Sequence, residues 1–187
     1  GHCETLESVS TIADGIAVKQ PGDLTYDLCE KYVDEVVTVT DDEVSTAILT
    51  LMEQHKMIAE GAGAVSVAAV MFNKIDVKGK KVACLVSGGN IDVNILSRVI
   101  SRGLLKAGRS VELSIELQDK PGQLREVSSI IADQGANVVA VHYDLGGEET
   151  EITACVLNIS METRNHAHIA QIRDALTAAG FKVSEKH

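Results

Sequence analysis

Residues 81–92 read Lys81-Val82-Ala83-Cys84-Leu85-Val86-Ser87-Gly88-Gly89-Asn90-Ile91-Asp92. The apolar run 81–86 predicts a buried strand, and Asp92 is placed to cap a following helix. Between them, the two glycines allow the backbone to approach a ligand closely. Because open α/β sheets bind ligands at the carboxyl ends of their strands, we expect Ser87 to lie at a small-molecule site.

The composition indicates a globular protein with α/β content. The chain has 187 residues, of which 45% are hydrophobic and 24% are charged. Only 3% are aromatic and tryptophan is absent, so any core must consist of Val, Ile, Leu and Ala, as in buried parallel sheets. The formal net charge of -10 disfavours a nucleic-acid surface, because such surfaces rely on Lys and Arg to neutralise phosphates.

The sequence also favours a cytoplasmic location. No apolar run approaches the roughly 20 residues of a membrane-spanning helix, and the first residues do not resemble a signal peptide. The four cysteines are scattered, with no Cys-x-x-Cys and no histidine at ligand spacing. We therefore expect a reducing compartment, no membrane partner and no metal site.

Residues 11–108 alternate between helical and strand patterns in the manner of βαβ units. The β-branched run 33–39 and the segment 81–86 have strand character. Helices are predicted over residues 24–32, 41–57, 61–73 and 92–105. The helix after Gly61 is small and apolar on most faces, which is typical of an interior helix.

After residue 108 the pattern changes, and a second domain is predicted over residues 109–187. Residues 111–117 alternate strictly between apolar and polar side chains, which indicates a strand with one solvated face. Further strands are expected at 136–145, 149–160 and 181–183, and helices at 123–134 and 166–179. The predicted order is βαββαβ.

Three short clusters in the first domain carry possible chemistry. Asp14 in Thr-Ile-Ala-Asp-Gly could cap a helix or bind a ligand, and Glu60 begins an apolar helix with closely spaced glycines. The turn Ser87-Gly88-Gly89-Asn90 lacks both the lysine of a phosphate-binding loop and the third glycine of a dinucleotide fingerprint. Taken singly, each cluster is more often structural, and a nucleotide-binding domain is disfavoured.

Taken in order, these clusters resemble the pyridoxal-phosphate-dependent threonine and serine dehydratases, also called ammonia-lyases. The resemblance covers residues 4–108 and includes Val39-Thr40-Asp41-Asp42-Glu43. It implies part of a fold-type-II, tryptophan-synthase-β-like catalytic domain over residues 1–108. By the same resemblance, Ser87 would bind the pyridine nitrogen of pyridoxal 5'-phosphate, Glu60 would lie near the ring edge, and Gly88, Gly89 and Asn90 would line the wall.

The family reaction removes water from threonine or serine and yields a 2-oxo acid and ammonia. However, the family's Schiff-base lysine, in an earlier Ser-x-Lys segment, and its glycine-rich phosphate cup do not occur in this sequence. Ser184-Glu185-Lys186 has the spacing but lies at the end of the other domain. We therefore expect a carboxyl-terminal segment of a longer lyase, inactive alone.

The second domain resembles the ACT regulatory domain, a ferredoxin-like α+β fold, in its βαββαβ order and its Asp-Lys-Pro-Gly turn. The resemblance implies side-by-side pairing in a homo-oligomer, with an amino-acid effector bound between two copies. The effector residues would be Asp119, Gly122, Gln123 and Leu124 of one copy and Asn137 of the next.

Two alternatives remain open from the sequence. The whole chain could be a stand-alone amino-acid-binding regulatory module without catalysis, and Asp-Lys-Pro-Gly could be an ordinary helix start.

His166 and His168 are two apart at a helix start, so they point to different faces. We interpret them as solvated residues that do not share a metal.

Overall fold

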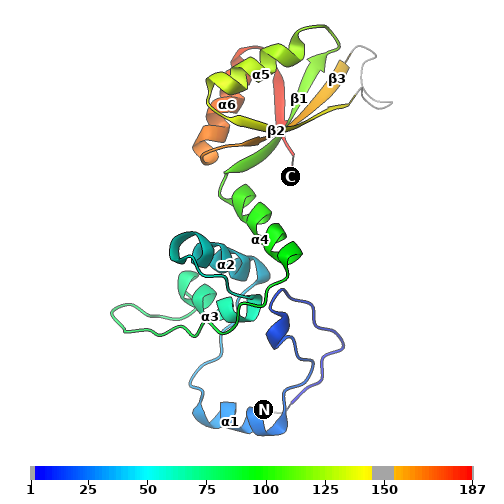
Figure 1. Cartoon of the computed structure of the whole chain (residues 1–187). Coiled ribbons are helices and arrows are strands. Elements are labelled where there is room, and N and C mark those ends of the chain that lie inside the picture. Colours follow the sequence, from blue (N-terminus) through cyan, green and yellow to red (C-terminus); the bar gives the residue numbers. More distant parts are fainter. Residues whose placement is uncertain (1–2, 145–153, 187) are drawn as a thin grey trace. The chain divides into compact units, whose positions relative to one another are not determined.

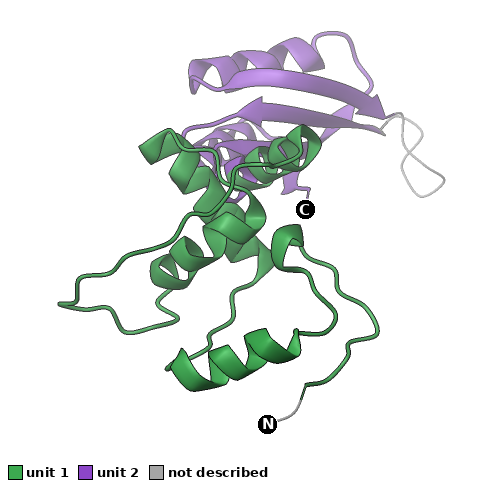
Figure 2. Ribbon diagram, turned by 60° about the horizontal axis from the view of Figure 1, so that its bottom comes forward, with its two compact units in different colours: residues 1–103 green, residues 104–187 purple. Residues whose placement is uncertain are grey.

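The computed structural model describes residues 3–144 and 154–186. The chain divides into two compact units, residues 1–103 and residues 104–187 (Figure 2). Each unit has its own cluster of buried hydrophobic residues. The functional boundary after residue 108 stays a prediction.

The first unit is built of helices (Figure 1). Its elements are the 3-10 helix η1 (Asp14–Ile16), α1 (Asp23–Tyr32), α2 (Asp41–His55), α3 (Gly61–Met71) and α4 (Val93–Lys106), whose last residues belong to the second unit. Its small core consists of residues of α2, α3 and α4 together with Ala59, which lies between α2 and α3: Val44, Ala47, Ile48, Leu51, Ala59, Ala64, Ala68 and Val99. The side chain of Asp92 accepts hydrogen bonds from the N–H groups of Asn94 (2.7 Å) and Ile95 (3.3 Å), so the predicted cap of α4 is confirmed.

The strands predicted at 33–39 and 81–86 are wrong for this structure. Neither segment is a strand, and the described part of the first unit contains no strand at all. A strand requires a neighbour that satisfies its backbone N–H and C=O groups. Residues 81–86 instead lie beside α3, where Ser66 contacts them, and Leu85 is 79% exposed.

The start of α2 is fixed by a capping box. The Glu43 N–H donates to the Thr40 hydroxyl (3.3 Å), and the Thr40 N–H donates to the Glu43 carboxylate (2.8 Å). The Lys74 ammonium lies 2.9 Å from the same carboxylate. The backbone N–H of Thr40 and, next, Lys74 lower the pKa of Glu43 below its ordinary value of 4.5.

We therefore predict an acid-sensitive α2. Because the pKa of Glu43 is lower in the folded than in the unfolded chain, its stabilising contribution is present above about pH 4.5 and is lost as the pH falls through the folded pKa. Thermal unfolding followed by circular dichroism between pH 7 and pH 3 should show a shallower acid loss for Glu43→Gln. Lys74→Met should reduce the loss only in part. An unchanged pH profile in Glu43→Gln would contradict the prediction.

The second unit has the predicted βαββαβ order. Its elements are β1 (Ser110–Gln118), α5 (Gln123–Asp133), β2 (Asn137–Asp144), β3 (Ala154–Glu162), α6 (His166–Ala178) and β4 (Lys182–Glu185). The strands form one sheet in the order β2-β3-β1-β4, and every neighbouring pair is antiparallel. The predicted strand ends at Leu145 and at 149–153 lie outside the described residues.

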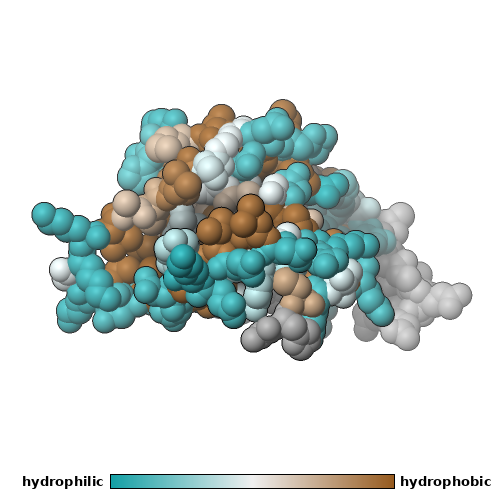
Figure 3. Space-filling view, turned by 90° about the horizontal axis from the view of Figure 1, so that it is seen from below, coloured by the Kyte–Doolittle hydropathy of each residue, from teal (hydrophilic) through white to brown (hydrophobic). Residues whose placement is uncertain are grey.

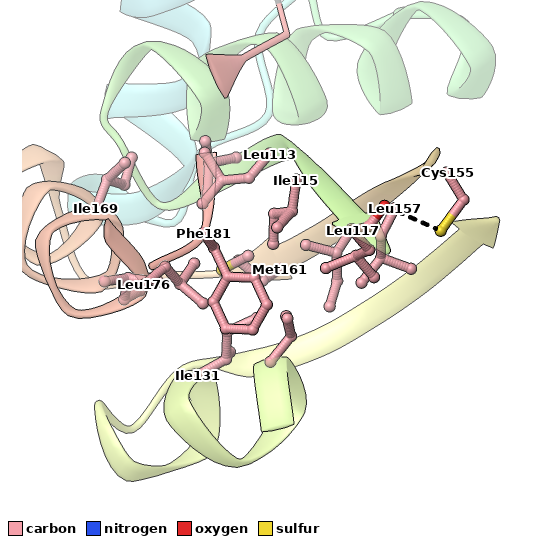
Figure 4. Packing of buried hydrophobic residues seen from close by; sticks show 14 residues of the cluster. Leu113, Ile115, Leu117, Ile131, Cys155, Leu157, Met161, Ile169, Leu176 and Phe181 are labelled. Carbon is pink, nitrogen blue, oxygen red and sulfur yellow. Dashed lines mark hydrogen bonds between the residues drawn. The ribbon is translucent and has the colours of Figure 1, made fainter. Parts of the chain in front are cut away.

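The helices α5 and α6 cover one face of this sheet (Figure 1). Burial alternates along β1 as the sequence pattern predicted. The core between sheet and helices includes Leu113, Ile115, Leu157, Met161, Ile131, Ile172 and Leu176, all 0% exposed (Figure 4). The polar side chains of β1 point to the opposite face, where the Ser114 hydroxyl donates to the Asn158 side chain (2.6 Å).

The sequence analysis interpreted His168 as a solvated residue, and this is wrong: its side chain is buried, with 2% exposed. Its Nδ1 accepts a hydrogen bond from the Arg164 N–H (3.1 Å), and its Nε2 lies 2.8 Å from the Gln134 carbonyl oxygen. The imidazole therefore joins the start of α6 to Gln134, the residue that follows α5. Helical spacing alone cannot show this role, because Gln134 is distant in the sequence.

Candidate cofactor site and effector turn

The three sequence clusters of the first unit meet in space. The Glu60 N–H donates to the Gly88 carbonyl oxygen (3.3 Å), and the Asn90 N–H donates to Glu60 Oε2 (3.2 Å). A Cβ atom placed on Gly15, in the Asp14 cluster, would lie 3.3 Å from Glu60 Oε1. The Glu60 carboxylate is therefore held among the other two clusters.

Close backbone approach at glycines makes this assembly possible. A Cβ atom on Gly63 would lie 2.5 Å from the Ser87 carbonyl oxygen, and one on Gly88 would lie 2.7 Å from the Glu60 carboxylate. A Cβ atom on Gly61 would collide with the Ile12 carbonyl. Gly88 also has a φ of +86°, which side-chain-bearing residues rarely adopt.

Ser87 fits the role of a ligand-binding hydroxyl. It is exposed, and its Oγ has no hydrogen-bond partner in the part of the chain that the structure describes. A hydroxyl can donate or accept, so it suits an aromatic ring nitrogen. Among the described residues, no lysine forms a hydrogen bond or ion pair with Ser87 or Glu60.

The predicted effector turn joins β1 to α5. Gly122 has a φ of +99° and precedes the first residue of α5, Gln123. The Asp119 carboxylate lies 3.5 Å from the Tyr143 hydroxyl. Two open cavities, of about 470 and 500 Å³, border Gln123. Leu124 is 43% exposed, so the side chains of the turn are accessible.

Asn137 is not near this turn within one chain. It opens β2 opposite Glu162, whose carboxylate accepts a hydrogen bond from the Asn137 amide (3.0 Å). Glu162 in turn pairs with Ser110 at the start of β1, whereas the turn follows the end of β1. The turn and Asn137 therefore lie at opposite ends of the sheet and could share a ligand only across two copies.

Sequence reasoning missed a polar pair beside the turn. The buried Cys155 thiol and the Tyr143 hydroxyl are hydrogen-bonded to each other (2.8 Å). The hydrogen bond with Cys155, burial of the hydroxyl and the charge of Asp119 raise the pKa of Tyr143 to about 12. No local signal could reveal this pair, because it depends on the register between β2 and β3.

Exposed apolar side chains are frequent in the first unit. Figure 3 shows hydrophobic residues open on the face that it presents. Val36, Leu24 and Val93 are more than 70% exposed.

Within the described residues, no helix has the length and apolar content that crossing a membrane requires. The same residues contain no cluster of three or more His, Cys, Asp or Glu suited to a metal ion.

Comparison with known proteins agrees with this two-part organisation. Residues 1–88 match the family of pyridoxal-phosphate dependent enzymes, and residues 106–179 match the ACT domain family. The chain is therefore a segment of a pyridoxal-phosphate-dependent enzyme followed by an ACT domain.

Relatives that align with nearly the whole of this chain narrow the family. The chain is 50% identical over 183 residues to L-threonine ammonia-lyase of Thermotoga maritima, an alignment covering 98% of this chain and 45% of that protein. It is 42% identical over 174 residues to L-threonine ammonia-lyase of Geobacter sulfurreducens, covering 92% and 43%. The chain belongs to the threonine ammonia-lyase (threonine dehydratase) family and spans less than half the length of these relatives.

Among solved structures, the processed form of threonine deaminase isoform 2 from Solanum lycopersicum is similar at 33% identity. That similarity covers 54% of this chain and 30% of the tomato chain, with a TM-score of 0.48.

Proposed function

We propose that this chain forms part of a pyridoxal-phosphate-dependent lyase that converts L-threonine to 2-oxobutanoate and ammonia in the cytoplasm. The observation that carries the proposal is the meeting of Glu60, Gly15 and the Ser87–Asn90 turn. Relatives named L-threonine ammonia-lyase support the choice of substrate. When bound, pyridoxal 5'-phosphate supplies an electron-withdrawing ring that stabilises negative charge at the substrate α-carbon.

The residues present would act on one edge of the cofactor. The Ser87 hydroxyl would bind the ring nitrogen, and Gly88, Gly89 and Asn90 would form the adjacent wall. Glu60 would lie near the ring edge, oriented by the Asn90 N–H. Because a neutral hydroxyl cannot hold the ring nitrogen protonated as a carboxylate would, this environment suits rapid loss of the β-hydroxyl group.

The chain alone is proposed to be inactive, since it offers no lysine for covalent attachment of the cofactor at this site. The purified chain with pyridoxal 5'-phosphate and threonine or serine should yield no 2-oxo acid in a coupled NADH assay. The full product of the gene should yield 2-oxobutanoate. Turnover by the 187-residue chain would contradict the inactivity, and an inactive full product would contradict the lyase.

The second unit is proposed to sense an amino acid. Asp119, Gly122, Gln123 and Leu124 of one copy and Asn137 of a second copy would form the effector site in a homo-oligomer. The edge position of β2, which leaves one side of that strand unpaired in the sheet, supports ACT–ACT pairing. Calorimetric titration of the chain with isoleucine, valine, threonine and serine tests effector binding, and no heat with any of them would contradict it.

A stand-alone regulatory module remains the second candidate, because no lysine among the described residues of the first unit contacts Ser87 or Glu60. The two candidates differ in the reading frame upstream of Gly1. A frame that continues into a Ser-x-Lys and a glycine-rich phosphate cup would eliminate the module. A start codon close to Gly1 would eliminate the lyase.

A further inference from the structure

Residues 84–90 lie along one face of α3. Glu60, Gly63 and Ser66 follow each other at intervals of three, so their side chains share one side of the helix. These three residues contact residues 84–90 in antiparallel order, so that the earliest of the three contacts the latest part of the segment. Glu60 contacts Gly88 and Asn90, Gly63 contacts Ser87, and Ser66 contacts Cys84 and Leu85.

Ser66 makes the contact farthest along α3. Its hydroxyl donates to the Leu85 carbonyl oxygen (3.0 Å), and its own carbonyl oxygen lies 3.7 Å from the Cys84 thiol. Residues 81–86 have no neighbouring strand in the described part of the first unit. The Ser66 hydroxyl therefore does what a sheet partner would otherwise do, because it fixes where this segment lies along the helix.

Ser87 lies between two anchors. On one side Gly88 is bonded to Glu60, and on the other side Leu85 is bonded to Ser66. The Ser87 hydroxyl has no bond of its own among the described residues. Its position is therefore set by the backbone, and the backbone is set by these two anchors.

We propose that Ser66 is a positioning residue for the Ser87 hydroxyl. This inference rests on the proposed function, in which Ser87 binds the cofactor ring. In this role Ser66 acts through the Leu85 carbonyl, to which its hydroxyl donates.

Hydrogen exchange of the chain itself tests the anchor. Ser66→Ala should speed exchange of the Glu60 and Asn90 amides, whose hydrogen bonds join Glu60 to residues 88–90, about fivefold, which corresponds to the loss of one hydrogen bond of ordinary strength. Ser66→Thr keeps the hydroxyl and should restore slow exchange. Ser45→Ala is the matched control on α2, since Ser45 has no hydrogen bond among the described residues. Unchanged exchange in Ser66→Ala would overturn the proposal.

Cofactor affinity of the complete gene product tests the positioning. Titration followed by pyridoxal-phosphate fluorescence should show about fivefold weaker binding for Ser66→Ala and recovery for Ser66→Thr. Faster exchange with unchanged affinity would overturn the positioning role and leave Ser66 as a structural anchor only. If the wild-type product binds no pyridoxal 5'-phosphate, the proposed function fails, and the positioning role falls with it. The exchange result would still stand.

Discussion

Gly63→Ala is expected to lower kcat/KM of the complete lyase about hundredfold. The added Cβ would lie 2.5 Å from the Ser87 carbonyl oxygen, whereas carbon and oxygen in contact normally lie about 3.3–3.6 Å apart. Ser87 must therefore move by about 1 Å, and displacements of that size at a reacting centre can cost about a hundredfold in rate.

The same substitution can also be tested in the chain itself, because its expected effect on stability is opposite to the usual effect of glycine to alanine in a helix. Glycine to alanine inside a helix usually stabilises by about 0.5–1 kcal/mol, but here we expect faster hydrogen exchange of the Glu60 and Asn90 amides, whose hydrogen bonds join Glu60 to residues 88–90. Gly22→Ala, at the residue before α1, is a control for the added methyl group away from the site, because Gly22 has a φ of -75° and a Cβ there would meet only the Thr25 hydroxyl, at 3.2 Å. The close approach of Gly63 to the Ser87 carbonyl would be refuted by two results together: unchanged exchange in the Gly63→Ala chain, and full cofactor affinity in the complete gene product with the same substitution.

Leu157→Ala is expected to destabilise the second unit by about 3–5 kcal/mol. Leu157 is 0% exposed at the centre of β3, paired with Ile115 on one side and Tyr143 on the other. Truncation removes buried methyl groups and leaves a cavity that the sheet cannot close. Since whole domains are stable by only about 5–15 kcal/mol, this change should unfold a measurable fraction of the unit.

Hydrogen exchange of the β1 and β3 amides measures that loss within the second unit alone. Leu105→Ala makes the same chemical change at a side chain that is 53% exposed, and we expect a loss below about 0.5 kcal/mol there. Equal losses in the two variants would show that Leu157 does not belong to a close-packed core.

The local sequence pattern was sufficient to predict most helices and strands of the second unit. The alternation of residues 111–117 and the Asp-Lys-Pro-Gly turn predicted β1 and the start of α5, because a sheet covered by helices on one face imposes a period of two. In the first unit the helices were also predicted, but 81–86 was not a strand. Apolar β-branched composition indicates a segment that can pair, and it cannot supply the partner.

The candidate site, too, was predicted only in part from the sequence. The sequence by itself supplied the candidate cofactor residues, because Ser87, Glu60 and the neighbouring glycines occur in the order of the dehydratase pattern, and their role stays a prediction. Only the tertiary structure decided that Glu60 is held by the Asn90 N–H, that His168 is buried, and that Asn137 lies away from the effector turn. These outcomes depend on contacts between residues distant in the chain, and such contacts are fixed by packing and strand register, which no local pattern contains.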